Sequence, residues 1–153
     1  MADQTFPIST GPIPVLDEQI CFALHSASRA ITGRYRDLLD PLGLTYPQYL
    51  VLSVLWQVEP VTVTYLGERL HLDSGTLSPL LRRMDTAGLL TRKRLPHDER
   101  SLQVSLTEAG SALRQEARGI TELICAATGV GPADLRALRD QIALLDAHVR
   151  ASH

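Results

Sequence analysis

The two cysteines carry the most reactive side chains of this 153-residue chain. Cys21 follows Asp17, a residue type that caps helices, so its thiol is expected in about the first turn of a helix. The positive end of the helix dipole favours the thiolate, which is the form that attacks oxidants and disulfides. No lysine or arginine lies close to Cys21, and unpaired cysteines are more often small buried apolar residues. Both a reactive thiol and an apolar packing residue therefore stay open.

The second cysteine, Cys125, lies near the end of a later predicted helix. The first residues of the chain include acids and prolines rather than the apolar run of a signal peptide, and no later stretch is long and apolar enough to span a membrane. We therefore expect a cytoplasmic protein with no membrane partner, whose cysteines rest as thiols. A permanent disulfide is not expected in that compartment, whereas a transient redox bond is compatible with it.

The histidines do not indicate a metal site. His25 stands four residues after Cys21 and shares a helix face with it, but this pair supplies only two ligands. His71 and His97 belong to another part of the chain. We expect neither a metal nor a cofactor, and His25 either stabilises a thiolate when protonated or packs as a neutral ring.

A second group of candidate residues is basic and lies between positions 82 and 100. This segment holds six basic and three acidic residues, a net charge of +3, although the whole chain has a net charge of −2. The composition excludes a wholly basic nucleic-acid binder, but a local basic surface is typical of a DNA-binding module. Arginines on a hairpin also protect sheet edges from pairing, so a merely solvated surface stays open on charge alone.

The elements that must position these residues are mainly helical. Apolar residues at helical spacing predict a first helix over about 17–40, which Asp17 begins. Thr45 and Gln48 have the spacing of a capping box for a second, largely apolar helix that ends before Pro60.

Two shorter helices are expected over about 62–70 and 74–87, and Asp73 is the predicted N-cap of the second. Pro79 lies beyond the first turn of that helix and removes a backbone donor there. A mild kink or a loosely wound first turn is therefore expected.

The apolar pattern then changes to alternation, which predicts a β-hairpin with strands at 91–94 and 102–106. A helix capped by Thr107 is expected over about 108–127, and the residues from Gly129 to Pro132 break the chain before a last helix. Apolar residues of the last helix recur at alternate spacings of three and four, at Leu135, Leu138, Ile142, Leu145 and Val149. This narrow seam suits packing against another helix, but the pattern also allows a helix lying on its own domain.

The order of these elements is that of a helix-turn-helix followed by a hairpin, in which the second helix enters the major groove with its N-terminus first. Small polar residues in the first turns of that helix approach phosphates and base edges closely, and the helix N-terminus adds positive charge. The spacing of Asp98 and Arg100 suggests an arginine that its neighbouring carboxylate aims into a minor groove. The candidate DNA-binding residues are Ser74, Gly75, Thr76, Ser78, Arg82, Arg83, Arg92, Arg94, Asp98 and Arg100.

Residues 16–110 resemble the MarR family of winged-helix repressors. The matching stretches are LDEQICFALHSASRAITGRYRDLLDPLGLTYPQYLVL, LGERLHLDSGTLSPLLRRMDTAGLL and RKRLPHDERSLQVSLTEAG. DSGTLSPLLRRM and DER carry the family, and CFAL with two tyrosines downstream resembles its OhrR subgroup of organic hydroperoxide-responsive repressors, of the two-cysteine type.

The resemblance implies a fold and an assembly. The fold is mainly α with a small β-hairpin wing, a winged helix-turn-helix with N- and C-terminal dimerisation helices in one domain over 1–153. Residues 45–107 form the DNA-binding lobe, and residues 1–44 and 108–153 supply the dimerisation helices. The implied partners are a second copy of the chain and a pseudo-palindromic double-stranded operator.

The resemblance also implies roles for individual residues. Cys21 is the peroxide-sensing thiol, Tyr35 and Tyr46 hydrogen-bond to it, and Cys125 resolves its sulfenic acid as an intersubunit disulfide. Tyr35 lies 14 residues after Cys21, which is about 21 Å on one continuous helix. A Tyr35 that contacts Cys21 therefore belongs to the other subunit. His25 departs from the family, because relatives often carry a tyrosine at this position.

The implied function is a repressor, not an enzyme, that releases its operator when an organic hydroperoxide oxidises Cys21 and derepresses a hydroperoxide-detoxifying gene. The hydroperoxide would enter an apolar pocket lined by Phe22, Leu24 and Tyr46. An alternative is the same repressor relieved by a non-covalent phenolic ligand or by another oxidant such as hypochlorite. A thiol peroxidase and a helical partner-binding protein without DNA affinity are further alternatives.

Overall fold

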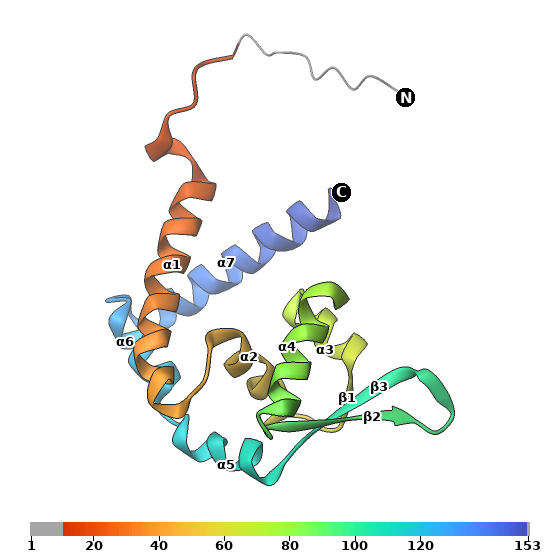
Figure 1. Cartoon of the computed structure of the whole chain (residues 1–153). Coiled ribbons are helices and arrows are strands. Elements are labelled where there is room, and N and C mark those ends of the chain that lie inside the picture. The colour runs from red at the N-terminus through yellow and green to blue at the C-terminus, as the bar shows by residue number, and fades with distance from the viewer. Residues whose placement is uncertain (1–10, 153) are drawn as a thin grey trace, which may run out of the picture.

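The computed structural model describes residues 11–152, apart from the side chains of residues 99 and 100. Its α-helices are α1 (Ile20–Leu39), α2 (Tyr46–Leu55), α3 (Val63–Leu70), α4 (Ser74–Thr86), α5 (Glu108–Glu116), α6 (Ile120–Ala127) and α7 (Pro132–Ala151) (Figure 1). Short 3-10 turns lie at Leu16–Glu18 and Asp40–Leu42, and the strands are β1 (Val61–Thr62), β2 (Leu90–Leu95) and β3 (Asp98–Leu106). The prediction of a mainly helical chain with a small β wing is confirmed.

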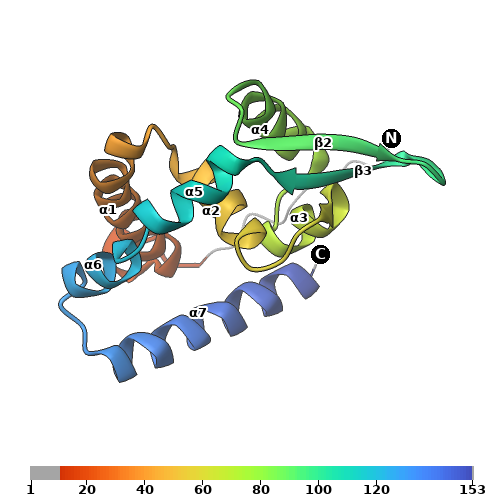
Figure 2. The ribbon, with the colours of Figure 1, turned by 90° about the horizontal axis from the view of Figure 1, so that it is seen from below.

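The core lies where α2, α3 and α4 meet the base of the sheet. Leu52, Leu66, Leu81, Leu90 and Val104 are fully buried there and come from all of these elements. Figure 2 shows α1, α6 and α7 outside this lobe, with α6 beside α1 and α7 running along the other side of the molecule. The lobe thus buries its own core, whereas the outer helices leave much of their surface open.

Three of the predicted helix starts are confirmed. Thr45 and Gln48 form the reciprocal capping box, in which the Thr45 N–H donates to Gln48 Oε1 at 3.0 Å. Asp73 Oδ1 accepts from the Thr76 N–H at 2.8 Å, and Thr107 Oγ1 accepts from the backbone at the start of α5. These caps satisfy backbone donors that would otherwise lack partners, which is why short polar residues mark the boundaries so well.

Two helix boundaries differ from the sequence-based predictions. The first helix starts at Ile20, because Asp17 lies within the preceding 3-10 turn and Gln19, which makes no side-chain cap, is the N-cap. The helix expected over 108–127 is two helices, since Gly119 adopts a left-handed conformation (φ 85°) between α5 and α6. Glycine enters this region without the steric cost that a Cβ imposes. Helix α4 is a continuous α-helix from Ser74 to Thr86. Pro79 lies inside it and does not interrupt it.

The hairpin is confirmed and belongs to an antiparallel sheet with the order β1-β3-β2. Leu90 pairs with Leu106 at the base of the wing, and the pairing continues to Leu95 and Asp98 after a register shift near the tip. The sequence did not predict β1, which pairs Val61 with Val104. Two residues are too few to display an alternating pattern.

Candidate functional site

A tight turn fixes α3 against α4. His71 adopts a left-handed conformation (φ 54°) at the end of α3, and the Leu72 N–H donates to the Gly67 carbonyl at 3.0 Å. A Cβ on Gly67 would come 2.9 Å from the Leu72 carbonyl oxygen, so this approach requires glycine. Buried Leu66 and Leu77 join the two helices behind the turn. The predicted helix-turn-helix is thus present, with the N-terminus of α4 directed outward.

The outer face of α4 carries most of the predicted polar contacts. Ser74, Gly75, Thr76, Arg82 and Arg83 are exposed, and Ser78 is half-buried. Leu77, Leu80, Leu81 and Met84 occupy the opposite face and are buried. This division leaves hydroxyls and an open helix N-terminus at one end and two guanidinium groups one to two turns further along, an arrangement that suits a phosphate-lined groove.

The wing holds the remaining predicted DNA-binding residues in different environments. Arg94 and Asp98 are exposed, and the Asp98 carboxylate accepts from the Ser101 hydroxyl at 2.7 Å. Arg92 is half-buried, and its Nε donates to Asp85 Oδ2 at 3.0 Å. Arg92 therefore joins the wing to α4, a role that the sequence analysis missed. The side chain of Arg100, and with it the proposed Asp98–Arg100 pair, lies outside the described residues.

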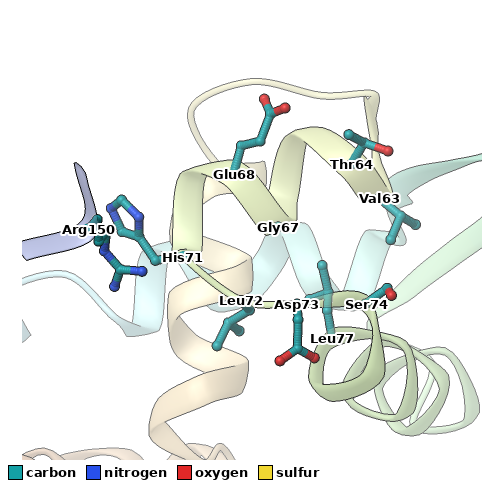
Figure 3. Close-up of a pocket in the computed structure, with 10 residues that line it drawn as sticks. All are labelled: Val63, Thr64, Gly67, Glu68, His71, Leu72, Asp73, Ser74, Leu77 and Arg150. Carbon is teal, nitrogen blue, oxygen red and sulfur yellow. The ribbon is translucent and has the colours of Figure 1, made fainter. Parts of the chain in front are cut away.

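An open hollow of about 610 Å³ separates α3 and the turn from the last turn of α7. Figure 3 shows the Arg150 guanidinium of α7 beside the His71 imidazole of the turn. Both oxygens of Asp146 accept from Arg150 Nε at 2.9 Å. This hydrogen bond is the main cause that holds the pKa of Asp146 below its usual value. Desolvation opposes it, and the electrostatic effects of Arg150 and His71 add to it. The last turn of α7 thus faces the helix-turn-helix of its own chain across this hollow.

The two tyrosines expected at the thiol site lie together. The ring centroids of Tyr35 on α1 and Tyr46 on α2 are 4.6 Å apart. Burial is the main cause that raises the pKa of Tyr35 to about 12, and the nearby ionisable groups of Tyr46, Tyr49 and Cys125 add to it. Burial also raises the pKa of Tyr46, with a smaller effect of Tyr49. Both phenols are therefore protonated at neutral pH and are available as hydrogen-bond donors.

The two cysteines occupy different places. Cys21 is exposed in the first turn of α1, and Cys125 is half-buried on α6 and contributes to the electrostatics of Tyr35. Helix α1 is continuous, so the premise that Tyr35 lies about 21 Å from Cys21 of its own chain is confirmed. One chain therefore packs Tyr35 against Tyr46, with Cys125 near enough to affect the pKa of Tyr35, and leaves Cys21 at the other end of α1.

The apolar pocket expected around Cys21 is not assembled within one chain. Phe22 is 40% exposed and Leu24 half-buried, both in the first turns of α1, whereas Tyr46 packs against Tyr35 near the other end of that helix. His25 is also exposed. Among the described residues, no group of three or more histidines, cysteines or acids could hold a metal ion.

The outer helices present a large apolar surface. No residue of α7 is buried, and its seam residues Leu138, Ile142, Leu145 and Val149 are 39–53% exposed. Ile20, Phe22 and Ile31 of α1 and Leu123 of α6 are exposed as well. The last helix therefore does not bury its seam within its own chain. Apolar surface of this extent is typical of a protein interface.

Three further residues were not singled out from the sequence. Tyr49 packs against Tyr35 and, edge to face, against Trp56, and Asp85 is the partner of Arg92. Tyr46, Tyr49 and Trp56 recur at spacings of three and seven, which is a helical face of aromatic residues and was a usable signal. Asp85 gives no such signal, because its partner Arg92 lies on another element. No helix of the described chain is long and apolar enough to span a membrane.

Known proteins that are similar in sequence or fold to this chain are transcriptional regulators. The model of the MarR family matches residues 44–102. The chain is 47% identical to the organic hydroperoxide resistance transcriptional regulator of Bacillus subtilis (strain 168) over 127 residues, which cover 83% of this chain and 86% of that protein. It is similar to reduced AbfR bound to DNA, with 31% identity, a TM-score of 0.72 and coverage of 88% and 94% of the two chains. For disulfide-formed AbfR, a Staphylococcus epidermidis protein, the identity is 33%, the TM-score 0.59 and the coverage 85% and 91%.

Proposed function

The chain belongs to the MarR family of transcriptional regulators, which are not enzymes, and from this premise we propose that it is a repressor that senses organic hydroperoxides through Cys21. The observation that carries the proposal is the division of the thiol site between the two ends of α1. An exposed thiol lies in its first turn, and Tyr35 near its end packs against Tyr46, with Cys125 of the same chain close enough to affect the pKa of Tyr35. When two copies pack with their α1 helices antiparallel, Cys21 of one chain lies beside Tyr35 and Tyr46 of the other, and both chains contribute to the thiol site.

The proposed assembly is a homodimer joined through the apolar faces of α1, α6 and α7. It presents two α4 helices to successive major grooves of a pseudo-palindromic operator, with half-sites about 34–36 Å apart. The exposed polar residues of α4 lie at the base edges and phosphates, and Arg94 and Arg100 of the wing lie along the backbone and minor groove. A regulator of this kind acts in the cytoplasm.

The proposed chemistry starts from the Cys21 thiolate. The helix N-terminus and the phenols of Tyr35 and Tyr46 of the partner subunit stabilise it, and it attacks the terminal oxygen of the hydroperoxide. The O–O bond breaks, the sulfur becomes a sulfenic acid, and the organic part leaves as an alcohol after taking up a proton. The thiol of Cys125 of the partner subunit then attacks the sulfenic sulfur, so that a disulfide forms and water leaves.

The disulfide supplies the conformational signal. In the proposed dimer the partner's phenols hydrogen-bond to the Cys21 thiolate, so a bond that brings the Cα of Cys125 within about 4.4–6.8 Å of the Cys21 Cα displaces a tyrosine ring or a helix. The TM-score is 0.72 with reduced, DNA-bound AbfR and 0.59 with disulfide-formed AbfR. This difference in fold similarity supports a change of shape between two such states. Displacement of α1 or α6 then turns the DNA-binding lobes away from the spacing of the operator.

Operator binding and non-reducing gel mobility test the proposal together. The wild type, Cys21→Ser and Cys125→Ser are measured with one equivalent of cumene hydroperoxide on a duplex selected in vitro from random sequence. We expect the wild type to lose binding and form a reducible covalent dimer, and Cys21→Ser to bind but ignore the hydroperoxide. Loss of binding by Cys21→Ser without hydroperoxide would make this cysteine structural. Loss of binding by oxidised Cys125→Ser would remove Cys125 from the switch, and an unresponsive wild type would favour a non-covalent ligand.

A further inference from the structure

A row of aromatic rings leads from the tyrosine pair to the far end of α2. The ring centroids of Tyr35 and Tyr49 are 5.6 Å apart, and those of Tyr49 and Trp56 are 6.1 Å apart in an edge-to-face arrangement. Tyr49 is buried, and Tyr35 and Trp56 are half-buried. Closely packed side chains leave little free volume between them, so a shift of one ring in this row moves the next ring. The row therefore connects α1 to the C-cap of α2 by direct contacts.

The row continues through a hydrogen bond to α5. The indole Nε1–H of Trp56 donates to the Gly110 carbonyl at 2.9 Å, across 54 positions of sequence. Gly110 is buried, and a Cβ at this position would overlap the carbonyl oxygen of Leu89. The backbone of α5 is thus held between the indole on one side and the 88–89 loop on the other.

The 88–89 loop joins α4 to the wing. The Thr107 N–H donates to the Leu89 carbonyl at 3.2 Å, and the Thr107 hydroxyl donates to the Gly88 carbonyl at 2.6 Å. The Leu89 N–H in turn donates to the Met84 carbonyl in the last turn of α4 at 3.0 Å. Direct contacts therefore run from Tyr35 on α1 to the end of the helix that reads DNA.

We propose that Trp56 is a positioning residue that couples the oxidation state of Cys21 to the orientation of α4. This inference rests on the proposed function, in which Cys21 oxidation displaces Tyr35 of the other subunit. Displacement of Tyr35 shifts Tyr49 and the indole, and the Nε1–H bond moves the start of α5 together with the loop that anchors α4. Trp56 touches neither the thiol nor DNA in this account, and it acts only through its neighbours.

The single tryptophan of the chain permits a test that removes the donor alone. Expression in a tryptophan auxotroph supplied with β-(3-benzothienyl)alanine replaces the indole N–H at position 56 by sulfur and keeps the ring shape. Operator affinity is measured before and after cumene hydroperoxide, and the oxidation of Cys21 is followed by intact mass. Val58→Ala, an exposed position two residues away, is the matched control.

We expect oxidation to lower the operator affinity of the wild type and the control by about 100-fold, within the usual range of coupling between sites. The benzothienyl protein should bind like the wild type when reduced and oxidise at the same rate, but lose less than about 10-fold on oxidation. Trp56→Phe, which also lacks the donor, should behave in the same way. An unchanged ratio of reduced to oxidised affinity in both variants overturns the inference, whatever happens to their thermal stability.

A second arm separates this inference from the proposed function. Should the wild type ignore hydroperoxide, the proposed function fails, and alkylation of Cys21 with N-ethylmaleimide then provides the displacement instead. A smaller loss of affinity in the alkylated Trp56 variants than in the alkylated wild type supports the coupling. Equal losses, or no loss in the wild type, overturn it.

Discussion

Arg92 of β2 and Asp85 of α4 form a half-buried ion pair, with 3.0 Å between Nε and Oδ2. The pair joins the wing to the last turn of the helix that lies in the major groove in our proposal. An arginine in a basic hairpin is usually assigned to DNA phosphates, but this guanidinium already has a carboxylate partner within its own chain. Its main effect on DNA binding is therefore expected through the angle between α4 and the wing.

Removal of either partner should lower operator affinity to a similar extent. We expect Arg92→Gln and Asp85→Asn each to weaken binding about 3- to 10-fold, and the double variant to be no weaker than the single ones, because the two residues act as a unit. The salt dependence of binding should stay that of the wild type. Additive losses, or a salt slope lower by about 1 for Arg92→Gln alone, would instead assign Arg92 to a phosphate.

Arg82 offers the opposite case, since it is exposed on the outer face of α4. Arg82→Gln should weaken binding to all duplexes and reduce the slope of log K against log salt by about 0.9, the value for one released counterion. Titrations between low and moderate salt measure this slope. Arg118→Gln, an exposed arginine between α5 and α6, is the control and should leave the slope unchanged.

Gly110 should not tolerate a larger side chain. Gly110→Ala places a methyl group against the Leu89 carbonyl, so we expect the free energy of unfolding to fall by about 3 kcal/mol, as for overpacking of a tight site. Ala109→Gly, an exposed neighbour on the same helix, should cost no more than about 1 kcal/mol. Urea denaturation of both variants gives the comparison, and equal losses would show that the close approach at Gly110 is unimportant.

The tyrosine cluster should titrate late. Burial raises the pKa of Tyr35 to about 12, so this phenol favours its protonated form more in the folded than in the unfolded state. Its contribution to stability is fully present below pH 10 and is lost as the pH rises through 12. Absorbance at the phenolate band should show this late step in the wild type, and Tyr35→Phe should remove it. Titration of all four tyrosines near pH 10 would contradict the burial.

Local chemistry explains what the sequence predicted well. The caps at Thr45, Asp73 and Thr107 depend on residues three positions apart, so a short pattern contains the whole interaction. Asp17 failed because a 3-10 turn competes for the same segment, a choice that tertiary context decides. The break at Gly119 was missed because a lone glycine in an apolar pattern is compatible with a continuous helix.

Interactions between distant elements were out of reach. The Arg92–Asp85 pair and the Trp56–Gly110 hydrogen bond depend on how the wing, α2 and α5 pack, which no local period encodes. The thiol site could also be predicted from the sequence only in part. Arithmetic on helix rise separated Tyr35 from Cys21 of its own chain, but the proximity of Tyr35 and Cys125 became visible only in the folded chain.

Helix α7 has 20 residues and buries none of them in its own chain. Helices in proteins owe most of their stability to packing of an apolar face, and in the proposed dimer the second copy supplies that packing for α7. Folding of the C-terminal segment is then a bimolecular event, and the midpoint of thermal unfolding rises with protein concentration. Under the same proposal, a monomer at low abundance would leave the C-terminal segment open to proteolysis until it finds a partner. In the proposed repressor, the rate of synthesis would thereby set, beside the oxidant, how many dimers are available to bind the operator.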